Sequence, residues 1–207
     1  MDVLAFIAIL TAYIWIFLPA TQGKTAVGLA FTLLAVAMAA FFAWRKGIRW
    51  AQTGLKLRGF PGDLALYLGA AAAYRGIVLL LFRSAIVRFS EQDWPSPGRI
   101  PWFLTWALLQ QFCLLAFLTN RLRQILRRDT PAAIVAAGLF AFFHLPNPFL
   151  VLYTLGGGLV IASIFLRRPS LPAATLAHAL SSFLVANLLP GAITGWMRVG
   201  PLYWGRH

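Results

Sequence analysis

Apolar residues dominate the chain in long runs, and short polar or basic segments separate these runs. A helix needs about 20 residues to cross the roughly 30 Å hydrocarbon core of a bilayer. The pattern therefore predicts an all-α, polytopic transmembrane helix bundle with about seven spans, at roughly residues 3–20, 25–43, 63–82, 101–120, 131–145, 147–166 and 170–189.

The fifth predicted span is shorter than the others, and Pro146 marks the point where it ends or kinks, because proline cannot continue an undistorted helix. No internal repeat or low-complexity tract divides the sequence. We therefore expect residues 1–207 to form a single membrane domain.

The composition supports this interpretation. Hydrophobic residues make up 60% of the chain and charged residues only 11%, whereas soluble domains carry about 25% charged residues. The formal net charge of +13 does not indicate a nucleic-acid partner, because so apolar a chain lacks the polar surface that would present it. The expected partner is the lipid bilayer. The chain has one cysteine, three histidines and five carboxylates, so we expect no metal site and no cofactor.

Basic residues between the spans indicate the orientation in the membrane. Eleven of them fall in the segments after spans two, four and six, whereas the opposite loops hold fewer and mix them with acidic residues. Cytoplasmic loops carry an excess of Lys and Arg. The amino terminus is therefore expected in the cytoplasm and residues 190–207 on the opposite side.

Several polar side chains lie inside the predicted spans. They are Arg75 in span three, Gln110–Gln111 in span four, His144 at the end of span five, and His178 with Ser182 in span seven. At a rise of 1.5 Å per residue, all of them lie roughly 12–20 Å from the cytoplasmic ends of their helices. Ionisable groups at this depth usually face a bundle interior or a wet cavity, so we expect one shared central cavity.

Helical spacing predicts which of these side chains share a face. His178 and Ser182 are four residues apart and stack on one side of their helix. Gln110 and Gln111 are about 100° apart around the helix axis, so we expect only one of them to face the cavity.

Three segments on spans four, five and seven resemble the motifs of the CAAX protease and bacteriocin-processing family (CPBP, or Abi). Gln110–Leu115 is similar to its first motif, Glu-Glu-x-x-x-Arg, and Phe140–His144 matches its second motif, Phe-x-x-x-His. His178–Ser182 is similar to its third motif, His-x-x-x-Asn. The three occur in the family's order, and the resemblance covers about residues 100–190, which implies a CAAX-protease-like core.

Both histidines of the motifs are present, but other positions depart from the family. Gln110 and Gln111 replace the two glutamates, Leu115 replaces the arginine and Ser182 replaces the asparagine. In the family, a glutamate and a histidine activate the attacking water, while a histidine and an asparagine bind the oxyanion. A neutral amide cannot accept a proton from water as a carboxylate does.

The resemblance implies an intramembrane endopeptidase that acts on a membrane-associated peptide or protein substrate. In that role His144 would activate water, His178 and Ser182 would form the oxyanion side, and Gln110–Gln111 would orient water or a carbonyl. Because no acidic residue lies in the spans, Arg75 is a candidate to bind an anion such as a substrate carboxylate. The compact chain and the resemblance together favour a bacterial inner (plasma) membrane.

Other interpretations of the same residues remain open. The missing carboxylates favour a non-catalytic relative, a pseudoprotease that uses the bundle for binding or assembly. The glutamine pair is also suited to interhelical hydrogen bonding, and Arg75 could snorkel to the membrane surface. Cys113 lies one turn from Gln110 and is either a small buried hydrophobe or the nucleophile of a Cys–His pair.

Overall fold

The computed structural model describes residues 2–20, 25–87 and 100–205, and within them it contains helices and no strands. Five helical segments are long and apolar enough to span a bilayer, and two further apolar helices are shorter. The prediction of an all-α polytopic bundle is therefore confirmed. In chain order the helices of the bundle are α1–α2 (Asp2–Ala12 and Leu18–Ala20, joined by π-helical Tyr13–Phe17), α3 (Thr25–Arg45), α4 (Phe60–Leu81), α5 (Ile100–Gln111), α6 (Asn120–Leu126), α7 (Asp129–Phe142), α8 (Pro148–Arg167) and α9 (Leu171–Leu188).

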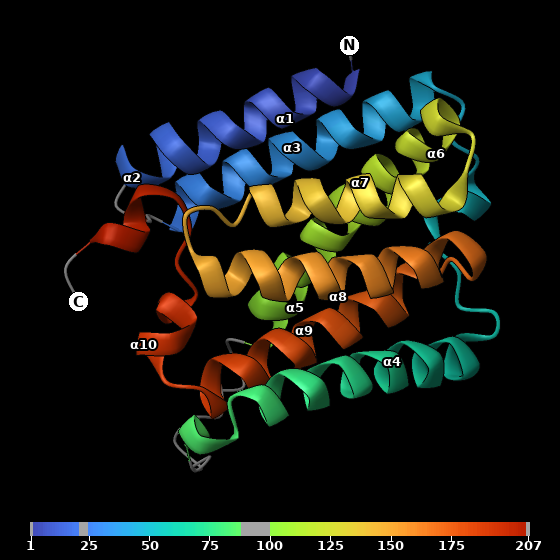
Figure 1. Ribbon diagram of the computed structural model, residues 1–207. Helices are drawn as coiled ribbons and strands as arrows, with labels where there is room; N and C mark the ends of the chain where they lie inside the picture. Colours follow the sequence, from blue (N-terminus) through green and yellow to red (C-terminus); the bar gives the residue numbers. More distant parts are fainter. Residues whose placement is uncertain (1, 21–24, 88–99, 206–207) are drawn as a thin grey trace.

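Two of these helices are connected into one transmembrane segment. Residues Phe112–Thr119 adopt a π-helical conformation and join α5 to α6 without a break. This segment packs against α3, α7, α8 and α9, so it is the central helix of the bundle. Figure 1 shows α1 beside α3, α7 beside α8 and α9 beside α4, with α5 lying behind α8.

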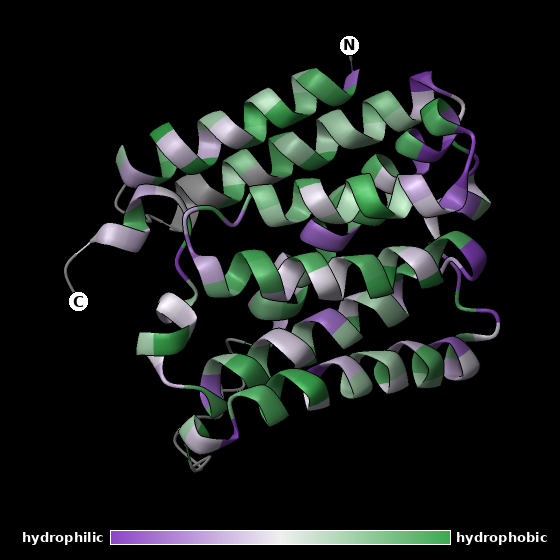
Figure 2. Ribbon diagram, in the orientation of Figure 1, coloured by the Kyte–Doolittle hydropathy of each residue, from purple (hydrophilic) through white to green (hydrophobic). Residues whose placement is uncertain are grey.

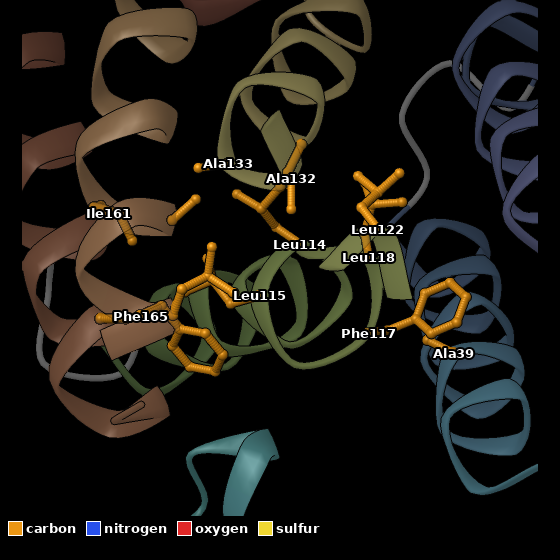
Figure 3. Close-up of a cluster of buried hydrophobic side chains, with 14 of the residues drawn as sticks. Ala39, Leu114, Leu115, Phe117, Leu118, Leu122, Ala132, Ala133, Ile161 and Phe165 are labelled. Atoms are coloured by element: carbon orange, nitrogen blue, oxygen red, sulfur yellow. The ribbon is translucent and has the colours of Figure 1, made fainter. Parts of the chain in front are cut away.

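Small side chains allow the central helix to approach its neighbours closely. Ala132, Ala133 and Ala136 of α7 are buried against the central helix, where Leu115 and Phe117 are fully buried. Figure 3 shows these leucine and phenylalanine side chains lying between α7 and α8 on one side and α3 on the other. In a lipid environment helices associate through close van der Waals packing rather than by avoiding water, which explains the alanine-rich contact.

Short turns complete the chain. Trp50–Thr53 forms a 3-10 turn between α3 and α4, and Arg83–Ala85 forms another after α4. Beyond α9 the chain forms α10 (Gly191–Thr194) and the 3-10 turns Gly195–Met197 and Gly200–Trp204. Asn147 ties this tail to the α7–α8 turn, because its buried Nδ2 donates hydrogen bonds to the carbonyl oxygens of Thr194 and Arg198.

The hydrophilic residues gather at one end of the bundle, where α3, α6 and α8 end (Figure 2). We call this the basic end; it comprises residues 45–59, 121–129 and 167–170 together with Asp2 and Asp63. All three carboxylates within the described residues form ion pairs here: Asp2 with Arg121, Asp63 with Lys56 and Arg168, and Asp129 with Arg123. The other two acidic residues, Glu91 and Asp93, lie outside the described residues. The described carboxylates therefore stabilise the end of the bundle and not its middle.

Candidate functional site

A cavity of about 810 Å³ opens within the bundle, with walls from the central helix, α1, α3, α4, α7, α8, α9 and the C-terminal tail. Its lining is mostly apolar, as in most sites that bind small organic ligands. Five residues predicted to carry chemistry all line this cavity: Gln110, Gln111, His144, His178 and Ser182. Arg75, which was expected to share this cavity, is not among the residues that line it.

His144 lies in the turn that follows α7, and its imidazole makes one well-defined hydrogen bond. Its Nδ1 is 2.7 Å from the carbonyl oxygen of Phe140, one helical turn earlier. A carbonyl oxygen can only accept a hydrogen bond, so Nδ1 carries the proton and Nε2 of the neutral ring is the acceptor. The Phe140 ring also packs edge-on against His144, with ring centroids 4.8 Å apart. The motif Phe140–His144 thus fixes both the position and the tautomer of this imidazole.

His178 lies on α9 across from the α7 turn. The same Phe140 ring lies near it, with ring centroids 6.2 Å apart, so one phenylalanine approaches both imidazoles. Ser182 is one turn further along α9 and lines the cavity with His178, as the four-residue spacing predicts. A neutral imidazole and a hydroxyl each offer one hydrogen-bond donor. This wall of the cavity can therefore donate to a carbonyl oxygen.

Gln111 is 1% exposed, and neither its Nε2 nor its Oε1 has a hydrogen-bond partner among the described residues. Gln110 is partly exposed, and both glutamines border the cavity, although the amide atoms of Gln111 are enclosed by protein. The cavity wraps around the central helix widely enough to reach side chains about 100° apart. The Gln110 side chain is thus accessible to an occupant of the cavity, whereas the Gln111 amide is not.

The π-helical stretch that follows Gln111 is held by side chains at the end where it joins α6. Thr119 Oγ1 donates to the carbonyl oxygen of Leu114, and Asn120 Nδ2 donates to those of Leu115, Ala116 and Gln52 at 3.3, 3.1 and 2.8 Å. A π-helix leaves carbonyl groups that lack an ordinary α-helical partner, and such segments are frequent at functional sites. Leu115, which stands where the family has arginine, is fully buried and only packs.

Arg75 lies behind the cavity wall rather than on it. Its Nη1 donates to Ser181 Oγ at 3.3 Å, and Ser181 in turn lines the cavity. Tyr153 Oη donates to the carbonyl oxygen of Ser181 at 3.5 Å, a long contact. The sequence does not predict Ser181 as the partner of Arg75, because the pairing depends on how α4 and α9 are rotated against each other. Its only sequence signal is its place beside Ser182.

The cavity contains no strongly charged side chain within the described residues: no Asp, Glu, Lys or Arg lines it. Nor do the described residues contain three His, Cys, Asp or Glu side chains placed to hold one metal ion. Cys113 does line the cavity, on the same helix as the glutamines. The chemistry available at the wall thus comes from imidazole, amide, hydroxyl and thiol groups.

Comparison with known protein families shows which family the chain resembles. The family model described as Type II CAAX prenyl endopeptidase Rce1-like matches residues 72–184, more than half of the chain, and the matched region contains every cavity residue named above. No curated protein and no solved structure matches the chain. The matched region agrees with the resemblance noted for residues 100–190 and extends it to α4. The chain is therefore a multi-pass membrane protein that belongs to the Type II CAAX prenyl endopeptidase Rce1-like family.

Proposed function

We propose that this protein is an intramembrane endopeptidase that hydrolyses a peptide bond of a membrane-associated substrate, with His144 as its general base. The observation that carries the proposal is the Nδ1 hydrogen bond of His144 to the Phe140 carbonyl oxygen. Since that bond keeps the proton on Nδ1, Nε2 can accept a proton from water. The imidazole belongs to the wall of a cavity that is large enough for a peptide.

In the proposed reaction, the residues of the cavity account for every proton that is transferred. His144 Nε2 takes one proton from a water molecule as its oxygen attacks the carbonyl carbon of the substrate. The negative charge that develops on the carbonyl oxygen is stabilised by an imidazole N–H of His178 and the hydroxyl of Ser182. When the C–N bond breaks, the imidazolium of His144 returns the proton to the leaving amine.

Two further groups have supporting roles in the proposal. Gln110 orients the attacking water or the substrate carbonyl, because its amide can donate and accept but not remove a proton, whereas the enclosed amide of Gln111 cannot reach them. Arg75 binds an anionic group of the substrate. Its hydrogen bond to Ser181 supports this role, because it holds the guanidinium directly behind a residue of the cavity wall.

We also propose an orientation and a location. The basic end lies in the cytoplasm, because positive charges concentrate on the cytoplasmic side of membrane proteins. The amino terminus, where Asp2 pairs with Arg121, is then cytoplasmic as well. The membrane is a bacterial inner membrane.

A second candidate is a non-catalytic relative that keeps the cavity for binding. It is favoured by one specific observation, the lack of any carboxylate among the described residues that line the cavity. In this candidate the same residues hold a peptide or protein partner without cutting it.

A cleavage assay on co-expressed membrane peptides separates the two candidates. We expect the native protein to cut and the His144→Ala variant not to cut, with unchanged amounts of both proteins in the membrane. His207→Ala, which removes the third histidine of the chain, is the matched control and should cut like the native protein. If only a Gln110→Glu, Gln111→Glu double variant cuts, the native chain is a non-catalytic relative.

A further inference from the structure

The basic end carries more cations than carboxylates, and the excess lies on its surface (Figure 2). Asp2, Asp63 and Asp129 form ion pairs with four of its cationic side chains. The other cations of this end are all exposed and have no carboxylate partner among the described residues: Arg45, Lys46, Arg49, Arg58, Arg127, Arg128 and Arg167.

The described part of the chain has no further carboxylate that could pair with these cations. The chain contains five acidic residues in all, and the two that are not at the basic end, Glu91 and Asp93, follow α4 in the sequence and lie outside the described residues. The chain leaves the basic end with Phe60 and reaches the opposite end of the bundle with Leu81 (Figure 1). The counter-charge for the exposed cations therefore comes from the surroundings of the protein.

The connection between α3 and α4, residues 46–59, exposes large apolar side chains beside these cations. Trp50 is 71% exposed and Leu57 is 74% exposed. Each is adjacent in sequence to an exposed arginine, Arg49 before the tryptophan and Arg58 after the leucine. Segments that lie in the headgroup region of a membrane combine these two features, because their apolar side chains enter the acyl boundary while their cations meet anionic lipids.

Backbone hydrogen bonds hold this connection against the bundle in one orientation. Asn120 Nδ2 donates to the carbonyl oxygen of Gln52 at 2.8 Å, and the backbone N–H of Leu171 donates to that of Gly54, also at 2.8 Å. Gly54 is buried, so this side of the connection faces α6 and α9. The exposed tryptophan and leucine are therefore presented on the outer side by a preorganised backbone, and preorganisation lowers the entropic cost of binding.

We propose that the outer surface of the α3–α4 connection binds the headgroups of anionic phospholipids. The cations of the basic end, including Arg49 and Arg58, pair with the lipid phosphate, and Trp50 and Leu57 enter the acyl boundary. A lipid fits this surface better than a soluble anion does, because a soluble phosphate would leave the tryptophan and the leucine exposed to water. The inference involves neither the cavity nor cleavage of a peptide, so it stands or falls independently of the proposed function.

The test measures lipid binding to the purified protein in detergent by native mass spectrometry. The protein is titrated with phosphatidylglycerol, which is anionic, or with phosphatidylcholine of the same acyl chains, which has no net charge. We expect the native protein to bind the first phosphatidylglycerol more tightly than the first phosphatidylcholine. Arg49→Gln and Arg58→Gln should each lower this preference about fivefold, the contribution of one cation near an anionic membrane surface.

Arg83→Gln is the matched control. Arg83 is exposed and follows α4 as Arg58 precedes it, so its substitution removes the same charge at the opposite end of the bundle. Its preference for phosphatidylglycerol should equal that of the native protein. Trp50→Ala should weaken the binding of both lipids by the same factor, because it removes an apolar contact and no charge. Thermal unfolding in the same detergent checks that each variant is folded.

Inorganic phosphate distinguishes a lipid headgroup from a free anion. Because exposed charges are screened by salt, phosphate is compared with chloride at equal ionic strength, and it should displace no more phosphatidylglycerol than chloride does. The inference is overturned if the native protein shows no preference for phosphatidylglycerol, or if Arg58→Gln and Arg83→Gln lower the preference equally. It is also overturned if phosphate displaces the lipid more strongly than chloride, or if Trp50→Ala binds both lipids with native affinity.

Discussion

The basic end and the cavity differ in the carboxylates they contain and in how those groups are paired. At the basic end every described carboxylate has a cationic partner, and Asp63 has two. In the cavity no carboxylate is present among the described residues, and a fully buried amide has no partner. Satisfied polar groups stabilise a fold, whereas unsatisfied buried groups lower its stability and are retained where they bind or react. The comparison indicates that the ion pairs of the basic end stabilise the bundle, whereas the cavity is the region to which we assign the proposed function.

The largest expected loss in the free energy of unfolding follows from a substitution at Gly54, in the basic end. This residue has φ +71°, and a Cβ there would lie 2.8 Å from the backbone nitrogen of Leu171 and 3.0 Å from that of Ser170. Gly54→Ala should lower the free energy of unfolding by about 3 kcal/mol, because a left-handed conformation and a backbone clash combine. Thermal unfolding of the native protein and the variant in detergent measures this loss.

Gly47 provides the matched control for that substitution. It also has a positive φ, +65°, but a Cβ there would meet nothing within 4 Å. Gly47→Ala should therefore cost only about 1 kcal/mol. Equal losses at the two glycines would contradict the close contact between the 50–54 turn and the start of α9.

A smaller loss in the free energy of unfolding is expected for a substitution at Asp63. Its side chain is 3% exposed and lies 3.2 Å from Arg168 Nη2 and 3.9 Å from Lys56 Nζ. Asp63→Asn should lower the free energy of unfolding by about 2 kcal/mol, less than a fully buried pair would lose because both cations are partly exposed to solvent. Asp129→Asn, at an ion pair exposed on both sides, should cost below about 0.5 kcal/mol in the same measurement.

A substitution at a buried amide beside the cavity should change the free energy of unfolding in the opposite direction from those at the basic end. Gln111→Met should raise the free energy of unfolding by about 1 kcal/mol, because an apolar side chain of similar size replaces an unpaired buried amide. Thermal unfolding is again the measurement, and Gln124→Met, which removes exposed hydrogen bonds, should show a slight loss. A loss above about 1 kcal/mol for Gln111→Met would show that the amide has a structural partner and would erase the contrast with the basic end.

The sequence was sufficient to predict much of the bundle and of the cavity. Run lengths predicted the seven apolar helices, and the depth of the polar side chains predicted one cavity, which Gln110, Gln111, His144, His178 and Ser182 line and Arg75 does not. The pairing of Arg75 with Ser181 could not be predicted, because a helix that is apolar on all sides shows no pattern for the face that contacts protein instead of lipid. The π-helical stretch could not be predicted either, because its residues are almost all apolar and show no pattern that distinguishes it from an α-helix. The only polar residues near it are Thr119 and Asn120, at its end.

The central claim is that a histidine, without a carboxylate, activates water in this cavity. The direct measurement is mass spectrometry of new peptide termini after purified protein is incubated with membranes in water enriched in oxygen-18. The native protein should generate new carboxyl termini that carry one oxygen-18 atom, and the folded His144→Ala variant should generate none. If the native protein generates no labelled termini, or if His144→Ala generates the same ones, the claim is contradicted.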